Sequence, residues 1–308
     1  MSREINHAIK NANRIHQDFS GILIRSVGYI VITLFSAACL IPFIMMVSAS
    51  FSSEKAVVRN GFSMFPQDPT LFAYKLTFQN PDVIIGSYVV TILITVIGTV
   101  VGLFITAMTG YALQRPDFRH RNAISLFFYF TTLFSGGLVP FYLLMTRYLH
   151  LKNNYLAVLL PLLLSAWNII MMKNFMKSIP HAITESTQID GAGPFRTFIS
   201  IILPMSTPSL ATIGLFIALG YWNEWYNSML FLDTNVKYRP MQLFLYNLIT
   251  GVEYIRNSAA RSNVPTQDVP LETMRMATAV IATGPVVLMY PFVQRYFIKG
   301  ITIGSVKG

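Results

Sequence analysis

The chain has 308 residues, of which 53% are hydrophobic and only 12% are charged, and its mean hydropathy is +0.52. A soluble domain usually carries about 25% charged residues, so this composition excludes an ordinary soluble domain and indicates an integral membrane protein. The net charge of +10 does not indicate nucleic-acid binding. The Lys and Arg residues lie beside long apolar runs, as is common in membrane proteins, and do not cover one polar face.

The chain begins with a polar, basic segment at residues 1–25, and the first predicted span follows at 26–50. About 20 apolar residues are enough to cross a hydrocarbon core of about 30 Å. The single cysteine, Cys39, lies inside this run, where a small buried apolar filler is its expected role. Residues 36–39 faintly suggest a lipoprotein cleavage site, but the apolar stretch is too long for a signal peptide. We therefore expect an uncleaved membrane helix.

Five further apolar runs of span length follow, separated by polar segments, and the predicted spans lie at 85–113, 123–145, 155–172, 201–221 and 276–298. Two longer polar stretches, 51–84 and 222–275, are predicted to be loops. The expected fold class is therefore an all-α integral membrane protein with six transmembrane helices in one domain, 26–303. A short tail at 304–308 completes the chain.

Six spans place both termini on one side of the membrane, together with the basic turn at 115–121 and the polar segment at 173–200. Short cytoplasmic segments carry an excess of Lys and Arg. The basic N-terminal segment, the basic turn and the cations Arg295, Lys299 and Lys307 therefore predict that this shared side is cytoplasmic.

Most of the predicted spans contain proline, which removes a backbone donor and can kink a helix. In lipid, the freed carbonyl groups must be satisfied by a neighbouring helix or by water in a cavity. The prolines concerned therefore either shape helix packing or line a pathway: Pro42, Pro140, Pro161, Pro204, Pro208, Pro285 and Pro291.

The segment between the fourth and fifth spans is predicted to form a rigid elbow. Ser178 can cap a short helix that has Pro180 in its first turn, and Asp190-Gly191 predicts a sharp turn because glycine tolerates positive φ. Pro194 can begin the next helix. Such an elbow suits docking into a groove of a soluble partner, because a short stiff helix loses little entropy on binding.

The elbow resembles the "EAA" loop of ATP-binding-cassette importer permeases, in which this loop forms the coupling helix that docks on the ATPase subunit. The resemblance assigns an ATPase-coupling role to eight residues: Glu185, Ser186, Thr187, Asp190, Gly191, Ala192, Leu203 and Pro204. Ser186 and Thr187 stand where the family motif has two alanines. Both side chains are small, so the departure concerns only the detail of the contact.

Four further segments extend the resemblance over nearly the whole chain: 134–140, 167–170, 220–225 and 294–308. They are similar to the carbohydrate-uptake permeases of the MalG-like branch, and most closely to the LplC/YtcP-type group. The resemblance implies import of an oligosaccharide or another sugar derived from a complex polysaccharide. It also implies a second homologous permease subunit, two cytoplasmic ATPase subunits that use ATP and magnesium, and an extracytoplasmic sugar-binding protein.

Two groups of residues are candidates for a sugar pathway: Trp167 and Asn168, and Trp222, Asn223, Glu224 and Trp225. Aromatic rings can cover the apolar faces of sugars while amides and carboxylates bind hydroxyls, but Trp222 and Trp225 are equally expected in an interfacial aromatic belt. Asn168 needs a polar partner within its span, either on a neighbouring helix or in the pathway. Ser135-Gly136-Gly137 is expected to form a turn or a close helix contact.

The sequence contains no phosphate-binding loop of the form Gly-x-x-x-x-Gly-Lys-Ser/Thr, so ATP hydrolysis is expected on another chain. The five histidines are scattered without ligand spacing, so no metal site is predicted. An ion-coupled secondary transporter remains an alternative, although the nearly charge-free spans disfavour it. A membrane enzyme would need a catalytic constellation that the sequence does not contain.

Overall fold

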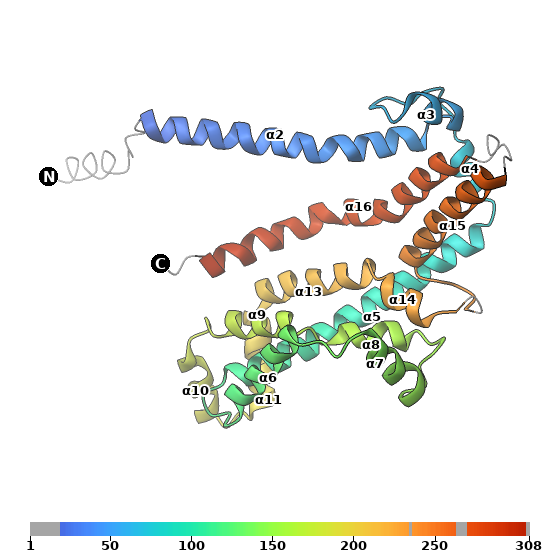
Figure 1. Ribbon diagram of the computed structural model, residues 1–308. Coiled ribbons are helices and arrows are strands. Elements are labelled where there is room, and N and C mark those ends of the chain that lie inside the picture. Colours follow the sequence, from blue (N-terminus) through green and yellow to red (C-terminus); the bar gives the residue numbers. More distant parts are fainter. Residues whose placement is uncertain (1–18, 234–235, 263–269, 306–308) are drawn as a thin grey trace.

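In a computed structural model that describes residues 19–233, 236–262 and 270–305, every described element is a helix (Figure 1). Three of these helices are long and apolar enough to cross a membrane unbroken: α2 (Phe19–Ser50), α5 (Pro81–Gln114) and α16 (Leu271–Ser305). Most of the predicted terminal segments, 1–25 and 304–308, lies outside the described residues, which leave out 1–18 and 306–308.

The predicted loop at 51–84 contains two short helices, α3 (Glu54–Asn60) and α4 (Phe72–Thr77). The Glu54 carboxylate accepts hydrogen bonds from the backbone N–H groups of Glu272 and Thr273, both at 2.9 Å, and from the Thr273 hydroxyl at 2.8 Å. The first N–H groups of a helix have no partner within it. A residue 218 positions away therefore caps α16 and fixes its start beside α3.

The predicted third span, 123–145, is not one straight helix. Helix α6 (Arg121–Leu133) and helix α7 (Leu138–Leu143), which continues into a π-helical turn (Leu144–Tyr148), meet at 112°. Gly137 has φ +86° and Gly136 has no atom near the position a Cβ would take. The Ser135-Gly136-Gly137 segment therefore forms a turn, and the glycines permit it.

Two further apolar segments are also bent. Helices α8 (Leu156–Leu163) and α9 (Ala166–Met176) meet at 41°, and the segment 194–205 meets helix α13 (Thr207–Trp222) at 85°. The predicted fifth span, 201–221, contains this bend at residue 206. If each bent pair is one span, the described part of the chain has six candidate spans, and otherwise three. The breaks lie at 134–137, 164–165 and 206, near prolines but not at them.

The predicted loop at 222–275 is largely helical, which corrects the sequence prediction. It contains α14 (Tyr226–Phe231) and the 22-residue helix α15 (Met241–Ser262). Met241 and Leu243 are buried, and the Met241 N–H donates to the Thr91 hydroxyl of α5 at 2.8 Å. The segment is too polar to be recognised as a span, yet one face of the helix packs on α5.

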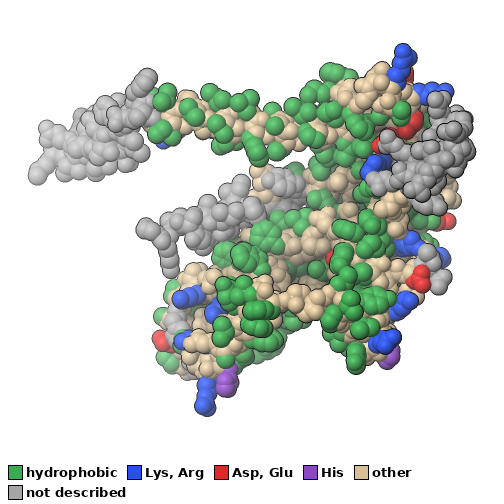
Figure 2. Space-filling model, in the orientation of Figure 1, with side chains coloured by type: hydrophobic (Ala, Val, Ile, Leu, Met, Phe, Trp, Pro, Cys, Tyr) green, Lys and Arg blue, Asp and Glu red, His purple; other side chains and the backbone are tan. Residues whose placement is uncertain are grey.

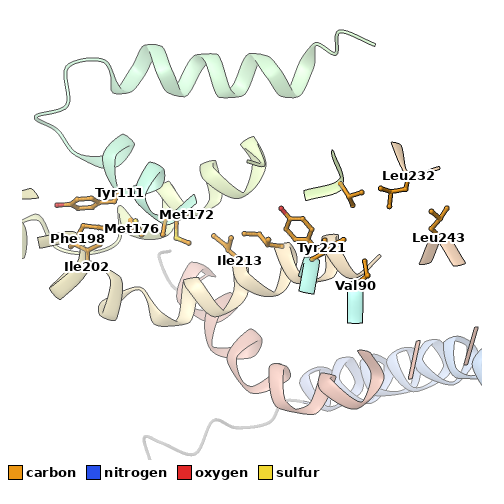
Figure 3. Close-up of a cluster of buried hydrophobic side chains, with 14 residues drawn as sticks. Val90, Tyr111, Met172, Met176, Phe198, Ile202, Ile213, Tyr221, Leu232 and Leu243 are labelled. Carbon is orange, nitrogen blue, oxygen red and sulfur yellow. The ribbon is translucent and has the colours of Figure 1, made fainter. Parts of the chain in front are cut away.

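The buried hydrophobic core gathers around α5, as Figure 3 shows. Side chains from α9, α13 and the segment before α13 pack on it, among them Met172, Phe198, Ile213 and Tyr221. The Tyr221 hydroxyl donates to the Leu159 carbonyl of α8 at 2.8 Å. These contacts join α5, α8, α9 and α13 into one packed unit.

Charged and apolar side chains are distributed unevenly over the surface. In Figure 2, Lys and Arg side chains gather at two opposite ends of the molecule, while hydrophobic side chains cover the long helices between them. Helix α2 is exposed along most of its length, from Ile22 to Ile44. An exposed apolar surface of this extent is typical of contact with lipid or with a partner helix.

Candidate functional site: an elbow joined to the second span

The predicted elbow is present in the structure. Helix α10 (His181–Ile189) ends at a turn, and helix α11 (Pro194–Thr197) begins with Pro194, as expected. Gly191 has φ +77°, which confirms the predicted positive φ. The Ala192 N–H donates to the Thr187 carbonyl at 2.9 Å, a bond that spans the end of α10. This pattern, with glycine in the left-handed conformation, is that of a Schellman helix end.

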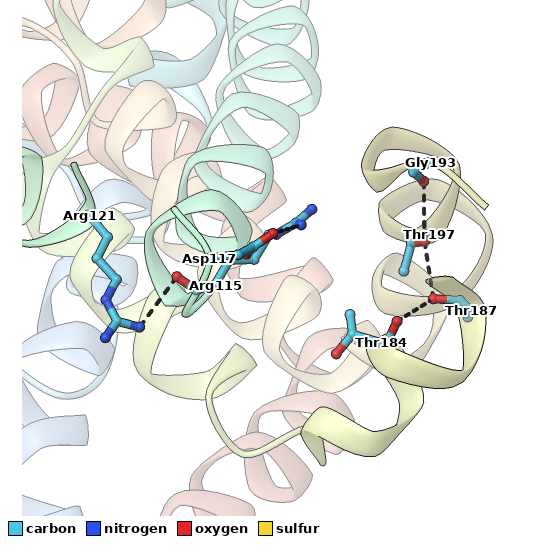
Figure 4. A network of polar contacts seen from close by, with 7 residues as sticks. All are labelled: Arg115, Asp117, Arg121, Thr184, Thr187, Gly193 and Thr197. Carbon is cyan, nitrogen blue, oxygen red and sulfur yellow. Dashed lines mark hydrogen bonds and ion pairs between the residues drawn. The ribbon is translucent and has the colours of Figure 1, made fainter. Parts of the chain in front are cut away.

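Threonine hydroxyls connect the two arms of the elbow (Figure 4). The Thr187 hydroxyl donates to the Thr184 carbonyl at 2.8 Å and lies 3.2 Å from the Thr197 hydroxyl. The Thr197 hydroxyl also lies 3.2 Å from the Gly193 carbonyl, so its single proton is directed to this carbonyl or to the Thr187 oxygen. Thr184, Thr187 and Thr197 are all buried. Thr187, which departs from the family alanine, therefore links α10 to α11 through a hydroxyl that alanine lacks.

The start of α10 differs from the prediction. Ser178 does not cap this helix, because its hydroxyl donates to the Phe175 carbonyl at 2.6 Å, at the end of α9. Helix α10 begins three residues later, so Pro180 immediately precedes it. The serine lies too early in the chain to reach the first N–H groups of α10, and it helps to end α9 instead.

The predicted coupling residues divide into a buried and an exposed set. Glu185, Ser186 and Asp190 are exposed, whereas Thr187 is buried. Ile189, which sequence analysis did not single out, leaves 86% of its surface exposed at the end of α10. An isoleucine this exposed, next to acidic side chains, gives α10 an apolar contact point with a polar border.

Leu203 and Pro204 lie apart from α10. They belong to α12 (Leu203–Met205), which follows a π-helical turn (Phe198–Ile202), and they immediately precede the 85° bend into α13. Leu203 is half-buried against the core, and Pro204 is exposed. The predicted coupling set therefore covers both ends of the connection between α10 and α13.

A stack of aromatic rings joins the elbow to α5. The rings of Phe198 and Tyr111 are stacked with centroids 5.4 Å apart, and Phe104 meets Phe198 edge-on at 6.1 Å. Phe198 is 1% exposed, so it is locked in the core. Sequence analysis missed these residues, because aromatic residues in an apolar run give no signal of which other segment they contact.

The turn after α5 lies beside this stack. Arg115 donates to both carboxylate oxygens of Asp117, with Nε 2.8 Å from Oδ1, and its guanidinium lies 5.7 Å from the Tyr111 ring centre. Hydrogen bonding to Asp117 raises the pKa of Arg115 further above its usual range. Arg121 donates to the Arg115 carbonyl, so the basic turn is held together by its own side chains.

Trp167 and Asn168 lie at the break between α8 and α9. Ser165 caps α9, its hydroxyl accepting from the Asn168 N–H at 3.4 Å. Trp167 is 65% exposed, and the Asn168 side chain is half-buried. Their position at an interrupted apolar helix is one that transporters use for substrate sites.

The second candidate group lies at the junction of α13 and α14. Glu224 accepts hydrogen bonds from the Asn227 backbone N–H at 2.5 Å and from its side-chain amide at 3.2 Å, so both residues serve the start of α14. Trp222 is only 8% exposed, whereas Asn223 and Trp225 are exposed. The Trp225 ring stacks on Tyr246 of α15 at 4.7 Å, a partner hidden in the segment predicted to be a loop.

Helix α5 carries a set of buried hydroxyl groups that sequence analysis did not single out. Besides that of Tyr111, four serine and threonine hydroxyls of α5 have no geometric hydrogen-bond partner among the described residues: those of Ser87, Thr95, Thr99 and Thr106. Buried polar groups in proteins nearly always have a partner. These hydroxyls are therefore further candidates for contact with water or a polar ligand.

Comparison with known proteins gives consistent results. Residues 114–303 match the family of binding-protein-dependent transport system inner membrane components. The chain is 38% identical to the polygalacturonan/rhamnogalacturonan transport system permease protein YtcP of Bacillus subtilis, over 89% of this chain and 95% of that one. It is 36% identical to Protein LplC of the same organism, over 88% and 90%.

A solved structure is also similar. It is that of a bacterial ABC transporter involved in the import of the acidic polysaccharide alginate. The TM-score is 0.77 at 31% sequence identity, and the match covers 91% of this chain and 98% of the matched chain.

Proposed function

Because this chain belongs to the family of binding-protein-dependent transport system inner membrane components and is a permease subunit of an ATP-binding-cassette importer, we propose that it forms half of a pathway for oligosaccharides derived from acidic polysaccharides. The permease is not itself an enzyme, and ATP is hydrolysed on a separate subunit. Membership of this family excludes the alternative that the chain is an ion-coupled secondary transporter. The elbow joined to α5 is the observation on which the proposed mechanism rests.

Two observations support an acidic cargo. The relative named for polygalacturonan transport and the structure named for alginate import are both more than 30% identical to this chain. In addition, exposed cations lie around the loops far from the elbow, among them Arg147, Lys152 and Lys237. Asp233 is also exposed in this region, but the three cations outnumber it, and a net positive surface raises the local concentration of anionic ligands.

The cargo is tested by uptake in cells with and without this chain. We expect deletion to abolish uptake of labelled galacturonic acid oligomers, and a plasmid copy to restore it. Uptake of a neutral arabino-oligosaccharide should be unchanged, since the energy supply and the membrane are intact. The opposite pattern, with neutral uptake lost and acidic uptake retained, would reject the acidic cargo and leave the permease assignment standing.

The six-span arrangement is the topology that places α10 on the ATPase side. The three continuous helices and the three bent pairs each supply one crossing. Both termini and α10 then lie in the cytoplasm, together with the basic turn after α5. The loop at 149–155 and residues 232–233 and 236–240 lie outside. The Asn153 side chain joins the two loops, because it accepts a hydrogen bond from the Asp233 N–H at 2.7 Å.

This topology predicts which side chains react with impermeant reagents. In a Cys39→Ser background, Ser186→Cys should be labelled by an impermeant maleimide only after the cells are opened. Lys152→Cys should be labelled in intact cells, because it lies on an exposed loop at the other end. Labelling of Ser186→Cys in intact cells would contradict the proposed orientation.

The proposed coupling runs from α10 to α5. Helix α10 docks on an ATPase subunit through the exposed residues Glu185, Ile189 and Asp190. Closure of the ATPase dimer moves the elbow as a unit, because the Thr187–Thr197 contact joins its two arms. The Phe198–Tyr111 stack then transfers this motion to α5. The ATPase dimer is open in one state of the transporter and closed in the other. The relative free energy of these two states changes only through contacts that differ between them.

The other half of the pathway belongs to a second homologous permease. The exposed apolar surface of α2 is suited to contact with that subunit or with lipid. An extracytoplasmic sugar-binding protein delivers the cargo to the outer loops. Trp167, Asn168, Asn223 and Trp225 are the proposed pathway residues that remain accessible, whereas Trp222 is buried and Glu224 is engaged in capping α14. The buried hydroxyls of α5 extend this set.

A further inference from the structure

A groove lies between the last turns of α5 and the second arm of the elbow, α11, with the first residue after it. It encloses about 230 Å³ and opens at the surface. Six of the seven residues that line it are apolar or aromatic, and the seventh is Arg115: Met108, Tyr111, Ala112, Arg115, Pro194, Phe195 and Phe198. The groove is part of neither the exposed face of α10 nor the candidate sugar pathway.

The polar groups of the groove are two side chains that can donate hydrogen bonds. Tyr111 is 5% exposed, and its hydroxyl interacts with the Arg115 guanidinium but makes no geometric hydrogen bond to any described residue. Figure 3 shows this hydroxyl pointing away from the hydrophobic cluster that holds the ring. The Arg115 guanidinium lies over the same ring. A guanidinium has five N–H donors, and Asp117 engages only two of its nitrogens.

The surroundings of the groove are basic. Arg119 is exposed on the turn that follows α5, and Arg196 is exposed on α11 beside Phe195, so both segments that border the groove carry a cation. Asp117 is the one acid of the turn, and it is paired with Arg115. The charge balance at the opening therefore favours an anion.

We propose that this groove binds an anionic phospholipid, with part of an acyl chain along its apolar wall and the phosphate held by Arg115 and the Tyr111 hydroxyl. Helix α5 is apolar enough to span a membrane, and the groove lies at its end, where acyl chains and headgroups meet. Basic pockets between membrane helices bind anionic headgroups. A free phosphate ion would use the donors but leave the apolar wall uncovered, and a peptide would need partners for its backbone.

The test uses the assembled transporter in phosphatidylcholine nanodiscs, titrated with a photoreactive phosphatidylglycerol. We expect the wild-type chain to be labelled at groove residues and to prefer phosphatidylglycerol to photoreactive phosphatidylcholine. Tyr111→Phe keeps the ring stack and removes only the hydroxyl, so it should weaken binding about tenfold, the loss of one hydrogen bond to a charged group. Ala112→Trp should fill the groove and abolish labelling.

The matched control is Tyr129→Phe, which removes a hydroxyl from an exposed tyrosine of α6 and should leave binding unchanged. Equal labelling by the two lipids would overturn the proposal, as would equal binding by Tyr111→Phe and Tyr129→Phe. Displacement of the lipid by inorganic phosphate alone would identify an ion site instead. If the wild-type chain binds no lipid and Tyr111→Phe loses a protein subunit from the complex, the groove is a protein interface instead.

Discussion

Replacement of Gly191 by valine should abolish sugar uptake while the membrane abundance of the chain stays close to normal. Gly191 has φ +77°, a conformation that costs a β-branched residue about 1–3 kcal/mol. No atom lies within 4 Å of the position its Cβ would take, so the cost is backbone strain alone and not a clash. The elbow is outside the apolar spans, so insertion should survive. Relief of the strain would reorient α10, and every contact of its docking face would weaken at once.

The chain offers a matched control two residues away. Gly193 has φ −67° and ψ 160°, which suit valine, and it too has open space at the Cβ position. Gly193→Val should therefore retain uptake, and Gly191→Asn should recover part of it, because asparagine tolerates positive φ. Glu185→Lys should give a milder defect, since it reverses one exposed charge without moving the backbone.

The measurement compares three quantities for each variant: the amount of chain in the membrane, the ATPase that co-purifies with it, and uptake of labelled sugar. Gly191→Val should lose both the co-purifying ATPase and the sugar uptake. Normal uptake by Gly191→Val would show that the segment is an ordinary loop. Loss of uptake with normal ATPase co-purification would move the defect from docking to a later step.

Replacement of Gly98 by leucine should prevent stable folding, the second large effect that we expect. An added Cβ at Gly98 would lie 2.3 Å from the ring of Tyr221, closer than side chains can approach. The ring cannot move aside freely, because it is buried and its hydroxyl donates to the Leu159 carbonyl. Overpacking a core typically costs about 1–3 kcal/mol. Separation of α5 from α13 would also break the contact with α8.

The control for this prediction is Gly220→Leu, an exposed glycine of α13 with no atom within 4 Å of its Cβ position. Two quantities are measured for both variants: the amount of chain in the membrane and the midpoint temperature of thermal aggregation in detergent. Gly98→Leu should fall to a small fraction of the wild-type abundance, and Gly220→Leu should not. Equal abundance would mean that α5 and α13 do not pack as closely as described.

The elbow shows how far local sequence can define a site. Gly191 at positive φ and Pro194 at the first position of a helix were both predictable, because each depends on the backbone preference of one residue. Ser178 was assigned to the wrong helix end, since helices α9 and α10 are only a few residues apart and a serine can serve either one. The Thr187–Thr197 contact needed the structure, because it joins residues across a turn.

The sequence alone determined that the chain is a helical membrane protein, that its long helices lie within apolar runs, and that a helical elbow lies between the fourth and fifth runs. These features follow from hydropathy, residue propensities and a local motif. Only the tertiary structure decided that three runs are bent, that α15 packs on α5, that Glu54 caps α16, and that Phe198 stacks on Tyr111. Each of these depends on contacts between segments distant in sequence, and in an apolar run many side chains could make such contacts equally well.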